Sequence, residues 1–284
     1  MNKQYLTLKL DEWIEEQRLQ EYAPSTLTRY KANVLKFINW LKDAEVITKD
    51  TTINYKMYLM NLNPRPKTSS INTWIKELNK YFKWLDAEEL KLKTIKQQLK
   101  TSTEDVLSIT DYQRLLRISK KLGMMKLYYI MKVLALTGCR IGELKVFTVE
   151  NIQSNYLPVY NKGKERNLIV RQDLLRELKH YCKDNKIKSG IIFTNSKGDK
   201  IIPQKTIWVQ MKKVAGIARV NKKKVHAHSF RHLFAQVFMD EYSGNITELA
   251  DILGHNSLET TRTYTRTSDK QKKEKLEKLK FKNK

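Results

Sequence analysis

The stretch TGCRIGEL, residues 137–144, follows a run of residues with the apolar spacing of a buried helix. Over residues 124–136 the apolar side chains recur at helical intervals, at Leu127, Ile130, Met131 and Leu134. Gly138 suits the end of that helix, because glycine adopts the left-handed conformation of a C-terminal cap without strain. Arg140 follows two residues later. The pattern therefore predicts a core helix that ends next to a charged residue.

The sequence after Arg140 predicts a β-hairpin and then further helices. Residues 156–160 and 166–170 have strand composition, and Asn161-Lys162-Gly163 supplies a turn between them. Apolar periodicity predicts helices for the rest of this part: one capped by Thr110 and running through Ile118, and others over 172–184, 204–215, 229–241, 246–253 and 258–264. The fold class predicted is mainly α, with a small β-hairpin in the second domain.

The first hundred residues predict a small helical bundle. Two apolar runs at helical spacing follow the helix-start signals Pro24-Ser25-Thr26 and Thr68-Ser69-Ser70. Four of the five tryptophans lie here, and core packing explains them better than base stacking: Trp13, Trp40, Trp74 and Trp84. Residues 91–104, KLKTIKQQLKTSTE, are polar and weakly periodic, which predicts an exposed linker. The predicted boundaries are a helical domain at 1–92, a linker at 93–104, a second domain at 105–268 and a basic tail at 269–284.

Composition supports this organisation and indicates the kind of partner. The chain has 284 residues, 40% of them hydrophobic, which is enough for about two domains and argues against disorder. Glycine and proline are scarce, at 9 and 5 residues, as expected for a helical protein. The formal net charge is +25, of which residues 1–100 carry +6 and the remainder +19. This excess indicates a polyanion, with nucleic acid the first choice, although a basic helix on a membrane surface fits the charge alone.

Two further features exclude other classes of protein. Cys139 and Cys182 are too few for a disulfide framework and form no CxxC zinc pair. The N-terminal segment MNKQYLTLKLDEWIEEQ is too charged for a signal peptide, and no apolar run approaches the ~18 residues of a membrane span. These observations argue against a secreted or membrane-spanning protein.

The candidate functional residues have ordinary structural explanations when each is taken alone. Arg140 can be a capping or surface residue, Lys162 can be a solvated hairpin lysine, and His255 can cap a turn after Gly254. Tyr264 is one of 14 tyrosines. Function therefore depends on how these residues combine.

The segment HAHSFRHLF, residues 226–234, holds the densest cluster of candidates. His228 and Arg231 are three apart, so that one helix face can direct both toward one ligand. His226, His228 and His232 can also be proposed as a metal site, but no Cys or acidic cluster supports it, and we expect no metal.

Taken in order, TGCRIGEL, the hairpin NKGKER, HSFRH, LGH and the following tyrosine resemble the tyrosine recombinase (phage integrase) family. That family has an Arg, a Lys on a β-hairpin, a His-x-x-Arg pair, a His or Trp, and a Tyr. The matching positions are Arg140, Lys162, His228, Arg231, His255 and Tyr264. The resemblance covers roughly residues 105–268. Because the hairpin differs by one residue from the GKGNKER of Xer recombinases, Lys162 is the better match for the Lys and Lys164 is the alternative.

The resemblance implies how phosphate would be bound. Arg140 and Arg231 would clamp the non-bridging oxygens of the scissile phosphate, and His255 would add a hydrogen bond to them. Guanidinium groups are always charged and offer forked donors, so this chemistry needs no metal and no cofactor. Glu143, three residues after Arg140, either orients the site from behind or forms a surface ion pair.

The resemblance also implies the covalent step. Tyr264 would be the nucleophile and would form a 3′-phosphotyrosyl intermediate with a free 5′-hydroxyl. A phenol has a pKa of about 10, so it needs a base or strong positive charge nearby. His228 is the candidate base, and Lys162 is the candidate acid for the leaving 5′-oxygen.

The family further implies a two-domain, C-shaped clamp around double-stranded DNA. Residues 1–92 would be the core-binding domain and 105–268 the catalytic domain. Four protomers would synapse two specific sites and pass through a Holliday junction, with the 269–284 tail docking on a neighbour. The length is similar to that of simple Xer or Cre recombinases and of TnpI-type resolvases of transposons. Such an enzyme would act in the bacterial or phage cytoplasm, at the nucleoid, in integration, excision or resolution.

Two alternative functions also involve DNA binding but differ from recombination in activity. The segment ITELADILGHNSLETTRTY, residues 246–264, resembles a helix-turn-helix, as a non-catalytic regulator would have. A type IB topoisomerase would share the phosphotyrosine chemistry but would relax supercoils without synapsis.

Overall fold

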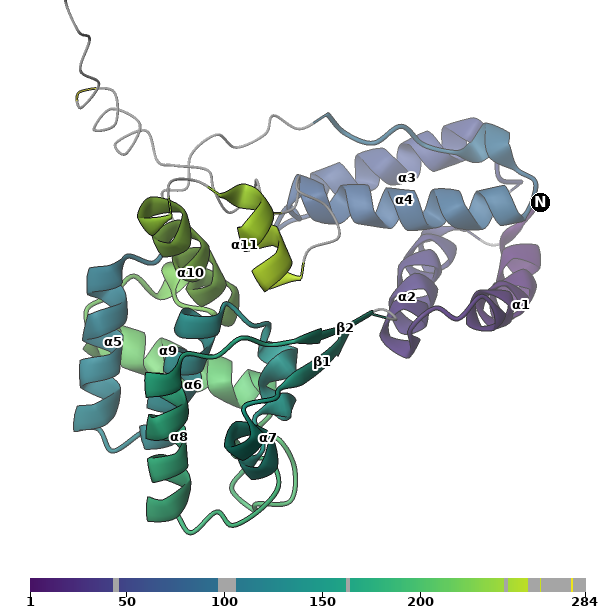
Figure 1. Cartoon of the computed structure of the whole chain (residues 1–284). Helices are drawn as coiled ribbons and strands as arrows, with labels where there is room; N and C mark the ends of the chain where they lie inside the picture. Colours follow the sequence, from purple (N-terminus) through teal and green to yellow (C-terminus); the bar gives the residue numbers. More distant parts are fainter. Residues whose placement is uncertain are drawn as a thin grey trace, which may run out of the picture. The chain divides into compact units, whose positions relative to one another are not determined.

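The computed structural model describes residues 1–42, 46–96, 106–161, 164–242, 245–254, 261 and 277. The chain divides into two compact units, Met1–Leu99 and Lys100–Lys284. The described residues are mainly helical and contain one sheet, of two strands (Figure 1). The predicted fold class, mainly α with a small hairpin in the second part, is confirmed.

The first unit is a bundle of four helices and one short 3₁₀ helix. Its elements are α1 (Lys3–Leu19), α2 (Pro24–Trp40), α3 (Lys49–Asn61), α4 (Thr68–Trp84) and η1 (Glu88–Leu90). Both predicted start signals are confirmed: α2 begins at Pro24 and α4 begins at Thr68. Proline is tolerated at the first position of a helix because the N–H group that it lacks would make no hydrogen bond within the helix. The side chain of Thr48 caps α3 by accepting a hydrogen bond from the Thr51 amide.

The tryptophans of this unit pack in or against its core, as predicted. Trp13 is fully buried between Tyr30 and Tyr81, at ring distances of 5.6 and 5.0 Å. Trp40, Trp74 and Trp84 are partly buried and lie against the same core. Aromatic packing therefore gives this unit its centre.

Residues 91–96, the first part of the segment that polarity predicts to be an exposed linker, are held to the bundle by hydrogen bonds. The Asn79 side chain both donates to the carbonyl of Leu92 and accepts from its amide, and Asn72 binds Ile95 in the same two ways. Leu92 is buried. Two asparagines of α4 thus fix a polar-looking segment to the bundle, a long-range effect that composition cannot reveal.

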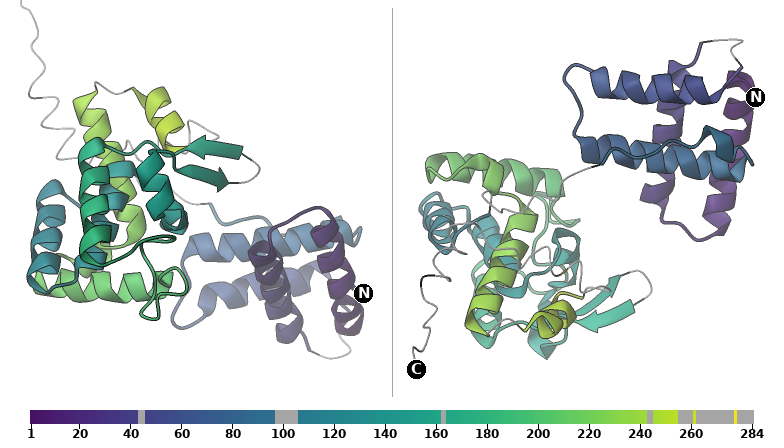
Figure 2. Two further views of the ribbon diagram at one scale, coloured as in Figure 1. Left: turned by 60° about the horizontal axis from the view of Figure 1, so that its bottom comes forward. Right: turned by 90° about the horizontal axis from the view of Figure 1, so that it is seen from above.

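The described part of the second unit has a central helix, six other helices, two short 3₁₀ helices and the hairpin (Figure 2). Its long helices are α5 (Ile109–Lys121), α6 (Met125–Thr137), α8 (Gln172–Asp184), α9 (Gln204–Ile217), α10 (Ala227–Glu241) and α11 (Ile246–Leu253). The short elements are η2 (Ile141–Val146), α7 (Val149–Ser154) and η3 (Lys222–Lys224). Most side chains of α6 are buried because α5, α8, α9 and α10 pack around it.

Helix α6 ends at Gly138 as the sequence predicts. Gly138 has φ +61°, and an added Cβ would lie 2.7 Å from the side chains of both Leu253 and Phe234. Only glycine meets both demands, and the chain can therefore turn sharply where α6, α10 and α11 meet.

The other helix predictions are close to the observed bounds. Residues 172–184 and 246–253 are helical as predicted, whereas α9 extends to Ile217 and α10 begins two residues earlier than expected. The predicted cap of α5 is wrong: Ser108, not Thr110, accepts the hydrogen bond from the Asp111 amide. The helix predicted over 258–264 lies outside the described residues except for Thr261.

The hairpin is present with a shifted register. Strand β1 (Pro158–Asn161) pairs antiparallel with β2 (Lys164–Asn167), so the second strand begins and ends earlier than the predicted 166–170. The charged residues of β2 have low strand propensity, but pairing with β1 overrides that preference.

No helix among the described residues is long and apolar enough to cross a membrane. Both cysteines, Cys139 and Cys182, are buried and free.

Candidate active site

Four of the candidate site residues lie in described parts of the second unit: Arg140, Glu143, His228 and Arg231. Lys162, His255 and Tyr264 lie outside the described residues, as does the 269–284 tail apart from Glu277. Lys164 is described only as the first residue of β2.

Arg140 and Glu143 are bound to each other at the start of η2. The Glu143 carboxylate accepts the Arg140 amide at 2.8 Å and its Nη1 at 3.1 Å, which caps the turn as a carboxylate does at a helix start. Glu143 is buried, at 7% exposure, whereas 38% of the Arg140 side chain is exposed. Burial contradicts the surface ion pair that was the alternative for Glu143. The guanidinium is oriented from behind and remains accessible in front.

A second arginine, which sequence reasoning did not select, binds the same carboxylate. Arg166 of β2 places Nη2 3.0 Å from Glu143 Oε2, and its Nη1 donates to the Ile252 carbonyl at 2.6 Å. The alternation of core-facing and solvent-facing side chains along β2 is the sequence signal that could have identified Arg166. Arg166 pairs with buried Val159 and lies two residues before buried Leu168, so an arginine faces the core there and requires an acidic partner.

Arg231 is fully buried on α10, at 1% exposure. Its Nη1 donates to the Gly138 carbonyl at 2.6 Å, and its Nη2 donates to the Leu253 carbonyl at 2.8 Å. These carbonyls lie at the C-terminal ends of α6 and α11, where helix dipoles favour a positive charge. The arginine thereby joins the segment that carries Arg140 to the end of α11.

His228 precedes Arg231 by three residues and lies in the same electrostatic environment. Partial burial lowers the pKa of His228, and the positive charges of Arg231 and Arg140 lower it further. His228 is therefore neutral at pH 7, the form that accepts a proton. The three residues that the sequence selected around this position are within electrostatic reach of one another.

The neighbouring histidines belong to the same end of α10. The rings of His228 and His232 meet edge to face at 5.0 Å, and burial lowers the pKa of His232 to about 4. His226 contacts the Ser229 hydroxyl at 3.0 Å. Among the described residues, no group of three or more His, Cys, Asp or Glu side chains is placed to hold a metal ion.

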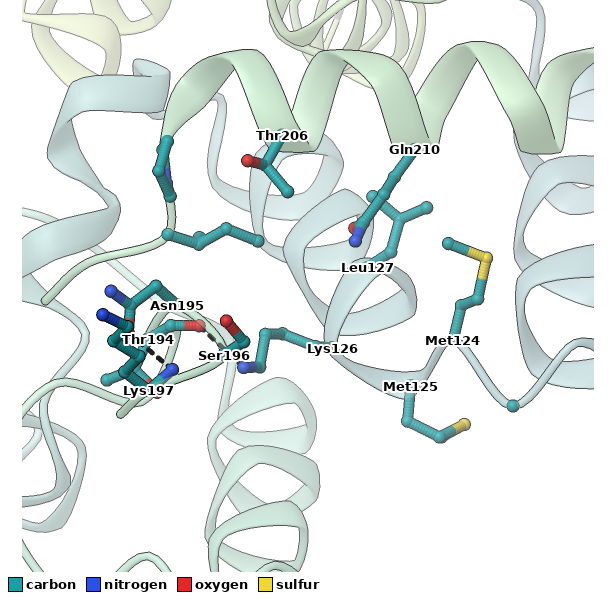
Figure 3. A pocket seen from close by; sticks show the side chains of 13 residues that line it. Met124, Met125, Lys126, Leu127, Thr194, Asn195, Ser196, Lys197, Thr206 and Gln210 are labelled. Carbon is teal, nitrogen blue, oxygen red and sulfur yellow. Dashed lines mark hydrogen bonds between the residues drawn. The ribbon is translucent and has the colours of Figure 1, made fainter. Parts of the chain in front are cut away.

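A pocket of about 500 Å³ lies elsewhere in the second unit, and none of the candidate residues lines it. It is bordered by the first residues of α6, the start of α9 and residues 194–197 (Figure 3). Lys126 donates to the Thr194 carbonyl at 2.6 Å across its floor. We therefore take the arginine cluster, and not this pocket, as the candidate site.

The cluster can bind a phosphate. Arg140, Arg166 and Arg231 bring three positive charges to one region, and Glu143 is the carboxylate bound to two of them. Guanidinium groups match the oxygens of a phosphate, and a neutral imidazole nearby can take a proton from a nucleophile.

Comparison with known proteins agrees with the motif order. Residues 105–271 match the model of the phage integrase family. The chain is 34% identical over 228 residues to the tyrosine recombinase XerA of Pyrococcus horikoshii, covering 75% of this chain and 74% of that protein. It is 25% identical over 279 residues to the tyrosine recombinase XerD of Vibrio cholerae, covering 89% of each.

The fold has solved counterparts. One is a lambda integrase tetramer bound to a Holliday junction, with a TM-score of 0.73 and 17% identity over 98% of this chain and 80% of that one. At this identity the likeness concerns the fold.

Proposed function

This chain belongs to the phage integrase family of tyrosine recombinases, which break and rejoin DNA, and we propose that Arg140, Lys162, His228, Arg231, His255 and Tyr264 form its active site. The observation that carries the proposal is the joining of the Arg140 segment to Arg231. The Gly138 carbonyl accepts Arg231, and Arg140 follows Gly138 by two residues. Two arginines 91 positions apart in sequence are thus brought to one place.

The proposed reaction is a transesterification. The Tyr264 phenol oxygen attacks the phosphorus, the bond to the 5′-oxygen breaks, and a 3′-phosphotyrosyl bond forms. His228 takes the phenol proton, and Lys162 gives a proton to the leaving 5′-oxygen, with Lys164 as the alternative acid. Attack by a 5′-hydroxyl on the phosphotyrosyl bond reverses the sequence, so rejoining needs no ATP.

The arginines stabilise the negative charge that develops on the non-bridging oxygens. Arg140 has an accessible guanidinium for this purpose. Arg231 is buried, at 1% exposure, so contact with a phosphate requires a rearrangement around it. A guanidinium has five N–H donors, which makes its bonds to the two helix-end carbonyls compatible with phosphate binding.

Glu143 acts from behind the site by holding Arg140 and Arg166. Residues 1–92 form the proposed core-binding domain, 93–104 the linker, 105–268 the catalytic domain, and 269–284 a tail that docks on a neighbouring protomer. The substrate is double-stranded DNA with a specific site, bound by a homotetramer that passes through a Holliday junction. This proposed assembly is the one that the lambda integrase of the same fold adopts, a tetramer bound to a Holliday junction. The enzyme acts in the cytoplasm at the nucleoid, in integration, excision or resolution of a mobile element, the TnpI-type role among them.

The test is a nicked duplex that carries the target site, analysed on a denaturing gel. We expect a covalent protein–DNA adduct without Mg²⁺ or ATP, and we expect Tyr264→Phe to abolish it. An adduct that survives this change would show that the nucleophile is another residue. Supercoil relaxation without Holliday junctions would favour a type IB topoisomerase.

The acid is tested with a 5′-bridging phosphorothiolate, whose leaving group needs no proton. This substrate should rescue Lys162→Ala far more than Arg140→Ala. Rescue of Lys164→Ala in place of Lys162→Ala would move the acid to the start of β2.

A further inference from the structure

Arg166 connects the hairpin to two other parts of the second unit. It lies in the middle of β2, opposite Val159 of β1, and 19% of its side chain is exposed. One terminal nitrogen contacts Glu143 at 3.0 Å, and the other donates to the Ile252 carbonyl at 2.6 Å. A single guanidinium therefore bridges β2, η2 and the end of α11.

The chain passes directly over this guanidinium at Gly254. Gly254 has φ +65°, and an added Cβ would lie 2.6 Å from Arg166 Nε and 2.7 Å from its Cδ. The left-handed conformation favours glycine, and a Cβ at this position would displace the Arg166 side chain. The next residue in the sequence is His255. The end of α11 is fitted to Arg166 as well as bonded to it.

Two arginines bind consecutive carbonyls of α11. Arg166 binds that of Ile252, and Arg231 binds that of Leu253. Each arginine also reaches the segment around Arg140: Arg231 through the Gly138 carbonyl, and Arg166 through Glu143. Four separate segments are therefore cross-linked by side chains around the proposed site.

The charges explain why Glu143 needs a second arginine. A buried carboxylate without a balancing cation is strongly unfavourable. If Arg140 were its sole cationic partner, Glu143 would compete with a phosphate for that guanidinium. With Arg166 on Oε2, the carboxylate can orient Arg140 through Oε1 and still leave the positive charge of Arg140 for an anion.

We propose that Arg166 is a positioning residue: it balances the charge of Glu143, so that Arg140 is oriented without being neutralised, and it anchors the end of α11 that leads into His255. This inference rests on the proposed function. Arg166 acts through Glu143 and the backbone of α11 and does not touch the reacting atoms.

The experiment measures single-turnover adduct formation on the nicked duplex, with the rate at saturating protein separated from the half-saturating concentration. The variants are Arg166→Ala and Arg166→Lys, with Arg171→Ala as the matched control. Arg171 loses the same charge in the same unit, but its partner Asp173 is an exposed neighbour, at 2.7 Å.

We expect Arg166→Ala to lower the saturating rate by about 10- to 100-fold, because small misplacements at a reacting centre have effects of that size. The half-saturating concentration should stay within about twofold, since a positioning residue changes the chemical step rather than binding. Arg166→Lys should recover part of the rate, because one ammonium can balance Glu143 but cannot fork to Ile252 as well. Arg171→Ala should match the unchanged protein.

A second measurement separates positioning from a merely structural role. In a Glu143→Gln background there is no carboxylate charge to balance and Arg166→Ala removes only the anchor to the Ile252 carbonyl, so it should lower the rate by less than about threefold. A structural effect would give the same factor in both backgrounds. If Arg166→Ala lowers the folded fraction, the Arg166→Gln variant is measured in its place in both backgrounds, because the glutamine amide keeps a donor for the Ile252 carbonyl.

Equal factors in the two backgrounds, or a loss confined to the half-saturating concentration, would overturn the inference. So would a rate for Arg166→Ala equal to that of Arg171→Ala. In each case a Tyr264-dependent adduct by the unchanged protein would leave the proposed function standing. Failure of the unchanged protein to form that adduct would instead count against the proposed function.

Discussion

Glu77 and Glu143 are buried carboxylates of nearly equal exposure, 6% and 7%, one in each compact unit. Glu77 lies on α4 and joins it to α2, where Arg29 Nε contacts it at 2.8 Å and the Asn33 amide donates to its other oxygen. Glu143 accepts from Arg140 and Arg166. The two sites look alike in burial and in having an arginine, yet we assign function to only one.

The two hydrogen-bond networks differ in their charged partners and in the elements that they connect. The Glu77 carboxylate contacts one cation, Arg29, whose side chain is 56% exposed. Its other partner is the neutral Asn33 amide, and the Lys36 ammonium contacts the oxygen of that amide.

The Glu143 network continues through Arg166 to α11, which also binds Arg231. Its positive charges outnumber the carboxylate. A buried ion pair therefore does not by itself indicate catalysis, but a buried network with surplus positive charge can accept an anion.

The largest expected contrast is between Arg231→Ala and Arg29→Ala. Loss of Arg231 removes a phosphate donor, which should lower the adduct rate on the order of 10²–10³-fold. It also leaves two buried carbonyls without this partner, which should lower the free energy of unfolding by about 2–4 kcal/mol. Loss of Arg29 removes the cation that contacts the buried Glu77 carboxylate, so it should also lower the free energy of unfolding, by about 3 kcal/mol, but it should leave the saturating adduct rate within about twofold. Denaturant titration and the adduct assay at saturating protein measure both quantities, and similar losses of adduct rate in the two variants would remove the distinction.

A smaller contrast is expected between Glu143→Gln and Glu77→Gln. Both changes remove a buried acceptor charge and should lower the free energy of unfolding by about 1–3 kcal/mol. Only Glu143→Gln should also lower the saturating adduct rate, by about 10- to 100-fold, because Arg140 loses its orientation. Comparable activity in the two variants would mean that Glu143, like Glu77, only supports the fold.

The smallest expected effect is that of pH. It should fall on the second unit, because all five histidines lie there. Burial holds the pKa of His232 at about 4, below its ordinary value, so the folded state disfavours the charged form. His232 therefore does not lower the free energy of unfolding above about pH 6.5, but that free energy falls as the pH drops from 6.5 toward 4. At pH 5 the loss should be about 1–2 kcal/mol. Hydrogen exchange should show weaker protection in α10 than in α4 on acidification, and His232→Gln should remove the difference; an equal response in both helices would contradict it.

Much of the fold could be predicted because its signals are local. The apolar spacing of α6, the glycine that ends it and the turn composition of the hairpin all act over a few residues. The predictions failed where distant residues intervene. Asn79 and Asn72 fix residues 91–96 by pairing with their backbone, and strand pairing sets the register of β2 against its propensity.

The candidate site divides in the same way. Arg140, His228 and Arg231 were found because their residue types recur in a fixed order, and their roles, with those of Lys162, His255 and Tyr264, remain proposals. Arg166 was not found, because the motif used the hairpin only for its lysine. Arg166 matters because it lies on the core-facing side of β2 and contacts Glu143, which is distant in sequence. The side of β2 on which it lies follows from the strand register, which the sequence did not show.

Helical periodicity and motif order are properties of the chain, and they were enough to predict the mainly helical fold and the family. Neither property shows that Glu143 is buried between two arginines or that Arg166 and Arg231 bind consecutive carbonyls of α11, which became visible in three dimensions. The physical reason is that helix formation depends on neighbours three and four residues apart, whereas a buried charge can be satisfied by any partner that the fold brings within hydrogen-bond distance.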